Sequence, residues 1–139
     1  MDGRAFLDVA QRLSQQATEP DWRTAAGRAY YALLLEGRAA LQRWGFMPQR
    51  RDQLHAFVRL RFVYAADQEL KTIGLTLEDL VVLRNRADYQ VENPGPFTSA
   101  LAVQQAIRDA RAAIALLDQM DGDPTRRTAA IAAIRAGSP

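Results

Sequence analysis

Apolar residues recur three and four positions apart along most of this chain, which is the pattern of amphipathic α-helices. Turn and capping signals divide the pattern into segments. The expected helices cover residues 2–16, 21–44, 52–66, 76–91, 99–121 and 123–136, with a less regular stretch at 68–73 that ends at Gly74. No segment alternates as a β-strand does. We therefore predict an all-α fold, an antiparallel up-and-down bundle of four to six helices in a single domain over residues 1–139. Residues 123–136 form a short accessory C-terminal helix.

The second and fifth expected helices carry the most apolar surface. The run of residues 29–35 is apolar on most sides, so the second helix should be central. On the fifth helix, apolar residues alternate four and three apart, a seam that fits a neighbouring helix or a second subunit. The seam residues are Val103, Ile107, Ala110, Ile114 and Leu117. Because both helices offer more apolar surface than a short bundle needs, we expect a homodimer.

The fourth expected helix combines a buried pattern with charge. Thr76 should cap its start, and the apolar turn 80–83 should be buried on every side. The same stripe continues through Arg84, Asp88 and Val91, which places two charges, Arg84 and Asp88, four positions apart toward the core. One interpretation is a structural ion pair, because an unpaired buried charge costs several kcal/mol. The other is an arginine positioned in a groove for a phosphate or a partner. Spacing alone favours the structural pair.

Composition narrows the classes of function. The chain has no cysteine, which excludes disulfides and thiolate chemistry, and one histidine, which excludes a di-iron bundle site. We expect no metal and no cofactor. A net charge of +2 argues against strong non-specific binding of nucleic acid. No apolar run approaches the roughly 20 residues of a membrane helix. Charges in residues 1–12 argue against a secretory signal, so we expect a cytoplasmic protein without membrane contact.

Two motifs are more specific than this background. The second expected helix contains Arg28-Ala29-Tyr30-Tyr31-Ala32, and the fourth contains Leu83-Arg84-Asn85-Arg86-Ala87-Asp88-Tyr89. Gly45 lies between them, and His55 precedes an apolar helix. Together these features resemble the HEPN superfamily, and within it the uncharacterised-protein branch with an Arg-x-x-Ala-Asp-Tyr motif. The resemblance covers residues 21–92 by motif, and continues to Met120 by helix order alone.

The resemblance implies a helical bundle that dimerises with its motif helices facing each other. Members are often metal-independent endoribonucleases of toxin–antitoxin or defence systems, and many pair with a minimal nucleotidyltransferase antitoxin. Their RNase motif is an arginine, often a polar neighbour, and a histidine after four to six intervening residues. Arg84 matches the arginine and Asn85 the polar neighbour, while Tyr89 stands where the first histidine position falls.

This departure bears on catalysis. Cleavage by the 2′-hydroxyl of RNA needs proton transfer, for which a histidine pKa near 6.5 is suited. Tyrosine, with a pKa near 10, is a poor base at neutral pH. Loss of such a group costs about 10²- to 10⁴-fold in rate. We therefore expect weak RNase activity or none.

The only histidine has two interpretations. Arg51, His55 and Arg59 are four positions apart, so they form one basic ridge on the third expected helix. This ridge either binds phosphates, with His55 reaching toward Arg84, or is an ordinary solvated face, which we favour.

The aromatic residues of the second expected helix also have two interpretations, and we favour core or dimer contacts over base-stacking platforms. They are Trp22, Tyr30, Tyr31 and Trp44.

Three functional hypotheses follow. The first is a HEPN-type component that binds RNA, a nucleotide or a nucleotidyltransferase partner, with Arg84 as its central contact. The second is a non-catalytic, homodimeric interaction module held together by Arg84, Asp88 and Tyr89. The third is an atypical RNase that uses Arg84, Asn85 and Tyr89, with His55 as a further candidate. The remaining groove candidates are Arg28, Tyr31, Asp88, Arg51, His55 and Arg59.

Overall fold

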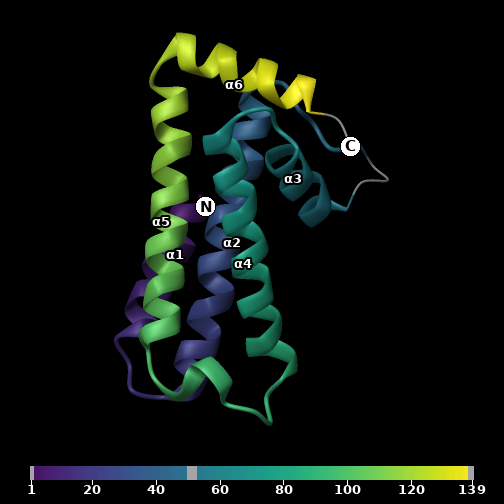
Figure 1. The fold of residues 1–139 in the computed structure, drawn as a ribbon. Coiled ribbons are helices and arrows are strands. Elements are labelled where there is room, and N and C mark those ends of the chain that lie inside the picture. The colour runs from purple at the N-terminus through teal and green to yellow at the C-terminus, as the bar shows by residue number, and fades with distance from the viewer. Residues whose placement is uncertain (1, 50–52, 138–139) are drawn as a thin grey trace.

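The computed structural model describes residues 2–49 and 53–137, and all regular elements in these ranges are helical. They are α1 (Gly3–Ser14), α2 (Glu19–Arg43), α3 (Leu54–Val63), α4 (Gln68–Tyr89), a 3₁₀ turn η1 (Gly95–Thr98), α5 (Leu101–Asp121) and α6 (Pro124–Ala136). The helices α1, α2, α4 and α5 run up and down along one long axis (Figure 1). The all-α bundle prediction is confirmed. None of the helices described is long and apolar enough to cross a membrane.

Helix α2 is the centre of the bundle and packs against α1, α4 and α5. Its buried side chains occupy most of its circumference, as the long apolar run predicted. The helix starts at Glu19, two residues before the predicted start, because Thr18 Oγ1 accepts a hydrogen bond from the Asp21 backbone N–H at 3.4 Å. Pro20 therefore lies in the first turn, where its missing N–H costs nothing.

The predicted break at Gly74 and the predicted cap at Thr76 are both wrong. Helix α4 begins at Gln68, capped by the Asp67 carboxylate, and continues through both residues. A Cβ atom on residue 74 would lie 2.7 Å from the backbone nitrogen of Val63 in α3, so glycine serves close packing here. The Thr76 hydroxyl donates back to the Thr72 carbonyl within the helix.

The turn at residues 80–83 is not buried on every side. Leu80 is in the core, whereas Val82 is 59% exposed. Val91, also predicted to face the core, is 64% exposed and follows the end of the helix. The outer face of α4 is open to solvent because α2, α3 and α5 cover only its other sides.

Two other predicted patterns are shifted, namely the buried face of the first helix and the cap of the fifth. The sequence spacing predicts Phe6, Val9, Ala10 and Leu13 on that face, and Thr98 or Ser99 as that cap. In α1 the buried residues are Gly3, Leu7, Ala10 and Ser14, with Phe6 and Leu13 at the edge of the core. Gly3 is needed because a Cβ there would lie 2.5 Å from the Ala32 carbonyl oxygen of α2. Helix α5 begins at Leu101, where the Ser99 hydroxyl accepts the Leu101 N–H, whereas Thr98 belongs to η1.

The apolar seam of α5 is buried within the chain itself, against α2 and its neighbours. The seam therefore leaves little surface for a second subunit, contrary to the reason given for a homodimer.

Helix α3 is shorter than predicted and ends at Val63, and Asp52 lies outside the described residues. Helix α6 crosses one end of the bundle (Figure 1), where the Ala66 N–H donates to the Ala133 carbonyl at 3.0 Å.

Candidate functional site

Helices α2, α3 and α4 bring most of the predicted site residues together. The Arg84 guanidinium donates a hydrogen bond to the Tyr31 hydroxyl at 3.2 Å, and its Cζ lies 5.6 Å from the centroid of the Tyr31 ring. The His55 ring from α3 lies edge-on to Tyr31, with the ring centroids 5.9 Å apart. We call this set the Arg84 groove; its residues are Arg28, Tyr30, Tyr31, His55, Arg59, Arg84 and Asp88.

Arg84 and Asp88 form the predicted ion pair, but at the wall of the groove instead of in the core. The side chains are 20% and 43% exposed, and Arg84 Nε lies 3.0 Å from Asp88 Oδ2. That distance suits a hydrogen bond, yet the buried Arg84 Nε–H is not satisfied by one. We take the pair as an ionic contact with poor hydrogen-bond alignment, because angle matters as much as distance.

Arg84 keeps donors for another group. Its two side-chain hydrogen bonds go to Tyr31 and to the Asn85 side-chain oxygen, at 3.2 Å each. A guanidinium has more N–H donors than these contacts use. Planar arginine donors match the oxygens of phosphate or carboxylate. Asp88 is thus an internal counter-ion that leaves part of Arg84 available.

His55 is solvent-exposed, as expected for a solvated face, and it also contacts Tyr30 and Tyr31 of the groove. Its Nδ1 and the Tyr30 hydroxyl are 2.5 Å apart, and the two rings stack with centroids 5.6 Å apart. The residue is nevertheless exposed overall. Partial burial lowers the pKa of His55, and the positive charge of Arg84 lowers it further. His55 is therefore neutral at pH 7.

Tyr30 contacts the rings of both Tyr31 and His55. It is 3% exposed, and its ring centroid is 5.3 Å from that of Tyr31. Burial raises the pKa of Tyr30, with Tyr31 adding to the rise and the charges of Arg84 and Arg59 opposing it. Tyr30 thus stays a neutral hydroxyl. The prediction of a core contact holds for Tyr30 and also for Trp44, which is 3% exposed.

Two hollows are lined by residues of the Arg84 groove, although Arg84 itself lines neither of them. One has a volume of about 260 Å³ and is lined by Thr24, Gly27, Arg28, Tyr31 and Asp88. The other has a volume of about 200 Å³ and is lined by Tyr30, Gln53, His55, Ala56, Arg59, Leu77 and Val81. Thr24, Gly27 and Gln53 were not predicted. The spacing of Thr24, Arg28 and Tyr31 four and three apart is the signal that could have placed them on one face.

The two rim arginines have no ion-pair partner among the described side chains. Arg28 lies over the Phe6 ring, with its Cζ 5.3 Å from the centroid. Arg59 lines the hollow beside His55. The third member of the predicted ridge, Arg51, lies outside the described residues. The groove therefore combines three arginines and one carboxylate, a local excess of positive charge.

Tyr89 stands apart from the groove floor. It is 72% exposed, and its ring centroid is 5.8 Å from Arg84 Cζ, on the outer side of α4. Asn85 is also exposed and contacts only the Arg84 guanidinium. Tyr89 can reach a ligand bound at Arg84. Within residues 2–49 and 53–137, however, no group forms a hydrogen bond that orients the Tyr89 hydroxyl. It is the least constrained of the predicted site residues.

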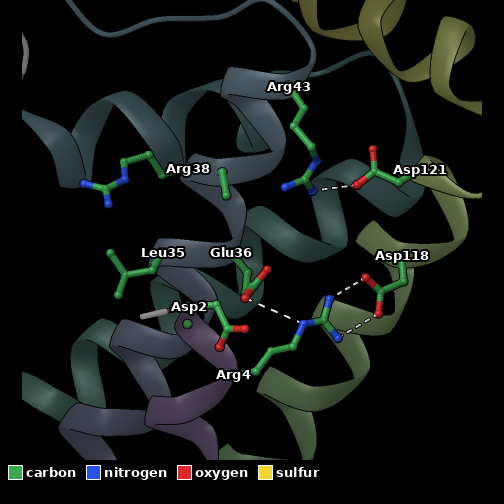
Figure 2. A pocket seen from close by; sticks show the side chains of 10 residues that line it. Asp2, Arg4, Leu35, Glu36, Arg38, Arg43, Asp118 and Asp121 are labelled. Atoms are coloured by element: carbon green, nitrogen blue, oxygen red, sulfur yellow. Dashed lines mark hydrogen bonds and ion pairs between the residues drawn. The ribbon is translucent and has the colours of Figure 1, made fainter.

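A further hollow of about 480 Å³ lies between the start of α1, the C-terminal part of α2 and the end of α5 (Figure 2). Five of its charged residues, Arg4, Glu36, Arg43, Asp118 and Asp121, form ion pairs with one another. Arg4 bridges Asp118 and Glu36, and Arg43 contacts Asp121 at 2.6 Å. These pairs join three helices, so we assign them a structural role.

The search for similar proteins found no match to this chain among models of protein families, curated proteins or solved structures. The groove also has no metal-binding character, since within residues 2–49 and 53–137 no three histidine, aspartate or glutamate side chains gather. Function must therefore be inferred from the groove and from the motifs themselves.

Proposed function

We propose that this chain is a HEPN-like component that binds single-stranded RNA or a nucleotide in the Arg84 groove. The observation that carries the proposal is the Arg84 guanidinium, which has donors to spare and lies over the Tyr31 ring. A phosphate would meet those donors, and Arg28 and Arg59 would extend the positive surface on either side. A neighbouring base would lie against the exposed part of Tyr31 or His55.

The groove chemistry favours RNA or a nucleotide over a simple anion. Bases stack on aromatic side chains with about 1–3 kcal/mol per base, and single-stranded RNA presents unstacked bases. Aromatic rings beside arginines are what such a ligand requires. The modest net charge of +2 agrees with a short binding site and not with an extended basic surface.

Cleavage through the family motif should be weak or absent. Tyr89 takes the position of the motif histidine, and its hydroxyl is a poor base at neutral pH. Its exposure and lack of an orienting hydrogen bond support the same conclusion. The resemblance further implies a toxin- or defence-type role and a minimal nucleotidyltransferase as the antitoxin partner. Copurification with a coexpressed nucleotidyltransferase tests that pairing.

The homodimer remains part of the proposal, on a different surface from the one first expected. Leu75, Val82 and Tyr89 are exposed and seven positions apart, so they line the outer face of α4. A two-fold axis at Val82 would place Leu75 opposite Tyr89 of the second copy. It would also place Glu78 opposite Arg86. This face is therefore complementary to itself, as a two-fold interface requires.

A non-catalytic interaction module is the second candidate. It is favoured by the Arg84–Asp88 pair, whose Nε and Oδ2 atoms lie 3.0 Å apart, and by the contact of Arg84 with Tyr31. In that case Arg84 would stabilise the bundle and bind nothing. The two candidates differ in what Arg84→Ala should change.

Binding of a fluorescent single-stranded RNA to wild-type protein and to Arg84→Ala separates the candidates. The RNA carries 2′-O-methyl groups so that it cannot be cleaved. We expect Arg84→Ala to weaken binding about tenfold or more, the loss of one good charged contact. Arg108→Ala is the matched control, because Arg108 is an exposed arginine on α5 that contacts only Gln105.

Thermal unfolding of the same samples completes the test. Weakened binding with an unchanged melting temperature supports a ligand site. A lowered melting temperature with unchanged RNA binding supports the interaction module. Equal RNA binding by wild type and Arg84→Ala contradicts the proposed RNA site.

A further inference from the structure

We propose that the hollow beside Asp88 binds a guanine base, and that Asp88 selects guanine over the other bases. The inference rests on the proposed RNA or nucleotide site and adds its base specificity. The hollow has a volume of about 260 Å³ and is lined by Thr24, Gly27, Arg28 and Tyr31 of α2 and by Asp88 of α4. Pockets that bury drug-sized ligands have volumes of about 300–1,000 Å³, so this hollow suits a single base whose sugar and phosphate stay outside.

The Asp88 carboxylate is the group that contacts the base edge. Its side chain is 43% exposed, and its Oδ2 lies 3.0 Å from Arg84 Nε. Because this contact does not satisfy the Arg84 Nε–H, and Oδ1 has no hydrogen bond within residues 2–49 and 53–137, the carboxylate can accept from a ligand. A carboxylate accepts hydrogen bonds and repels a phosphate. The part of a nucleotide that meets Asp88 is therefore the base.

Guanine is the base whose donors match a carboxylate. Its Watson–Crick edge carries two adjacent donors, the N1–H and the N2 amino group, which the two carboxylate oxygens accept side by side. Adenine and cytosine each present one amino group beside an unprotonated ring nitrogen, and uracil presents one N–H between two carbonyl oxygens. Each of these edges places an acceptor against the carboxylate. A base that leaves polar groups of the site unpaired is bound less tightly.

Arg28 supplies donors for a second edge of the same base. Its Cζ lies 5.3 Å from the centroid of the Phe6 ring, and no ion pair joins Arg28 to Asp88, both of which the structure describes. Because the two residues line one hollow without pairing, one offers donors and the other acceptors to a ligand there. O6 and N7 of guanine are the acceptors that arginine contacts as a pair. Tyr31 adds an aromatic surface for the base.

Tyr31 and Asp88 connect this hollow to Arg84. The Arg84 guanidinium donates to the Tyr31 hydroxyl at 3.2 Å, and the same arginine contacts Asp88. A base in the hollow is therefore adjacent to the donors that Arg84 keeps for a phosphate. Gly27 leaves the α2 side of the hollow open, since the nearest atom to a Cβ on this residue would be Arg84 Cγ at 3.9 Å.

The test titrates the protein with the 5′-monophosphates of guanosine, inosine, adenosine and cytidine, followed by amide chemical shifts. Inosine is the sharpest comparison, because its base is guanine without the N2 amino group. We expect guanosine monophosphate to bind wild type about tenfold more tightly than the others. Asp88→Asn replaces an acceptor by an amide donor, so guanosine and inosine should then bind equally. Asp109→Asn is the matched control and should keep the preference, since Asp109 is an exposed carboxylate on α5 that accepts from Gln105.

A second arm distinguishes a base within RNA from a free nucleotide. Two 2′-O-methyl RNAs of equal length differ by one guanine in place of an adenine. Binding that is about tenfold tighter for the RNA with guanine, and equal for the two RNAs in Asp88→Asn, supports a guanine hollow that serves RNA. Equal binding of the two RNAs, with guanosine monophosphate still preferred, supports a guanine hollow that serves a free nucleotide.

The remaining outcomes overturn the inference. Similar affinity for all four monophosphates and for both RNAs overturns it and leaves the proposed binding site standing. A guanosine preference that survives in Asp88→Asn overturns the role of Asp88. Affinities are compared as ratios within each variant, so loss of the Arg84 counter-ion, which acts on every ligand alike, does not imitate a loss of preference. Failure of wild type to bind either RNA or any monophosphate overturns the proposed function as well.

Discussion

At Gly74, α4 passes so close to α3 that a side chain would not fit. A Cβ atom would lie 2.7 Å from both the nitrogen and the Cγ2 atom of Val63. By propensity alone glycine ends or weakens a helix, which is why a helix end was predicted there. The structure shows that the residue instead permits a close approach of two helices. The difference is visible only when α3 is placed beside α4.

Gly74→Ala should therefore destabilise the fold although alanine is the better helix former. Overpacking of this kind costs about 1–3 kcal/mol in the free energy of unfolding. Gly27→Ala is the control, because its Cβ would lie 3.9 Å from the nearest atom, Arg84 Cγ. That change should be neutral or stabilise by up to about 1 kcal/mol. Urea denaturation of both variants measures the difference, and equal stabilities would refute the packing argument.

His55 makes the stability of the protein depend on pH. Partial burial, and then the charge of Arg84, lower its pKa below the ordinary value of 6.5. The unfolded chain therefore binds more protons than the folded chain once the pH falls below 6.5, and the folded state loses stability in that range. Above that pH the ring is neutral in both states and contributes no pH dependence.

The variant His55→Gln removes this titration. We expect the free energy of unfolding of wild type to fall relative to that of His55→Gln as pH decreases from about 6.5 to 5, and to run parallel above it. Urea denaturation at several pH values measures both. A difference between the two proteins that stays constant across this range would contradict the lowered pKa.

At the scale of elements, α4 is ended by a side chain from α2. Arg23 donates to the carbonyl oxygens of Arg86 and Ala87 in the last turn of α4, at 3.1 and 2.9 Å. It also donates to the Asn93 carbonyl and lies 4.7 Å from the Phe97 ring centroid. The helix thus ends at Tyr89, two residues before the predicted end at Val91. Cations at a helix C-terminus are favourable because its carbonyls are unpaired.

Loss of the Arg23 cap at the end of α4 should lower the free energy of unfolding. Arg23→Ala leaves carbonyls of α4 and of the following turn without a charged donor, which costs about 1.5–3 kcal/mol. The exposed Arg108→Ala should change the free energy of unfolding by less than about 0.5 kcal/mol. Thermal or urea unfolding of the pair gives the comparison. Similar values for the two variants would show that the cap is not a major contributor.

Most elements could be predicted because their information is local. Helix α2 followed from a dense apolar run and from Thr18 and Pro20 at its start, and α6 from Asp123 and Pro124. The predictions were wrong where a contact between residues distant in sequence sets the local structure, as at Gly74, which packs against α3. The wrong predictions also include the face of α1, where Gly3 lies against the backbone of α2. Local patterns contain no information about such contacts.

For the whole molecule, the outer face of α4 should determine the association of two copies. Val82→Glu places a charge on the proposed two-fold axis, where it would face its own copy. We expect this variant to be monomeric where wild type, with a chain mass of 15.5 kDa, forms a dimer of twice that mass. Leu101→Glu is the control, since Leu101 is 72% exposed on α5. Light scattering at micromolar concentration decides, and a monomeric wild type would remove the dimer from the proposal.

The candidate site could be predicted in part. The i, i+4 spacing of Arg84 and Asp88 predicted their contact, because the geometry of a helix places residues four positions apart next to each other. Their depth in the molecule was wrong, since exposure depends on which helices cover α4. The pairing of His55 with Tyr30 lay beyond the sequence, because these residues are 25 positions apart and on different helices.

Local sequence patterns were enough to predict that the chain is helical, where α2 and α6 lie, and that Arg84 would contact Asp88, because these properties depend on neighbours within a turn or two. Packing between distant helices set the unbroken course of α4 past Gly74 and covered the α5 seam within the chain. It also decided that Tyr30, Tyr31, His55 and Arg84 form one groove. These outcomes depend on how helices distant in sequence approach each other, and packing fixes that approach only when all their side chains are in place.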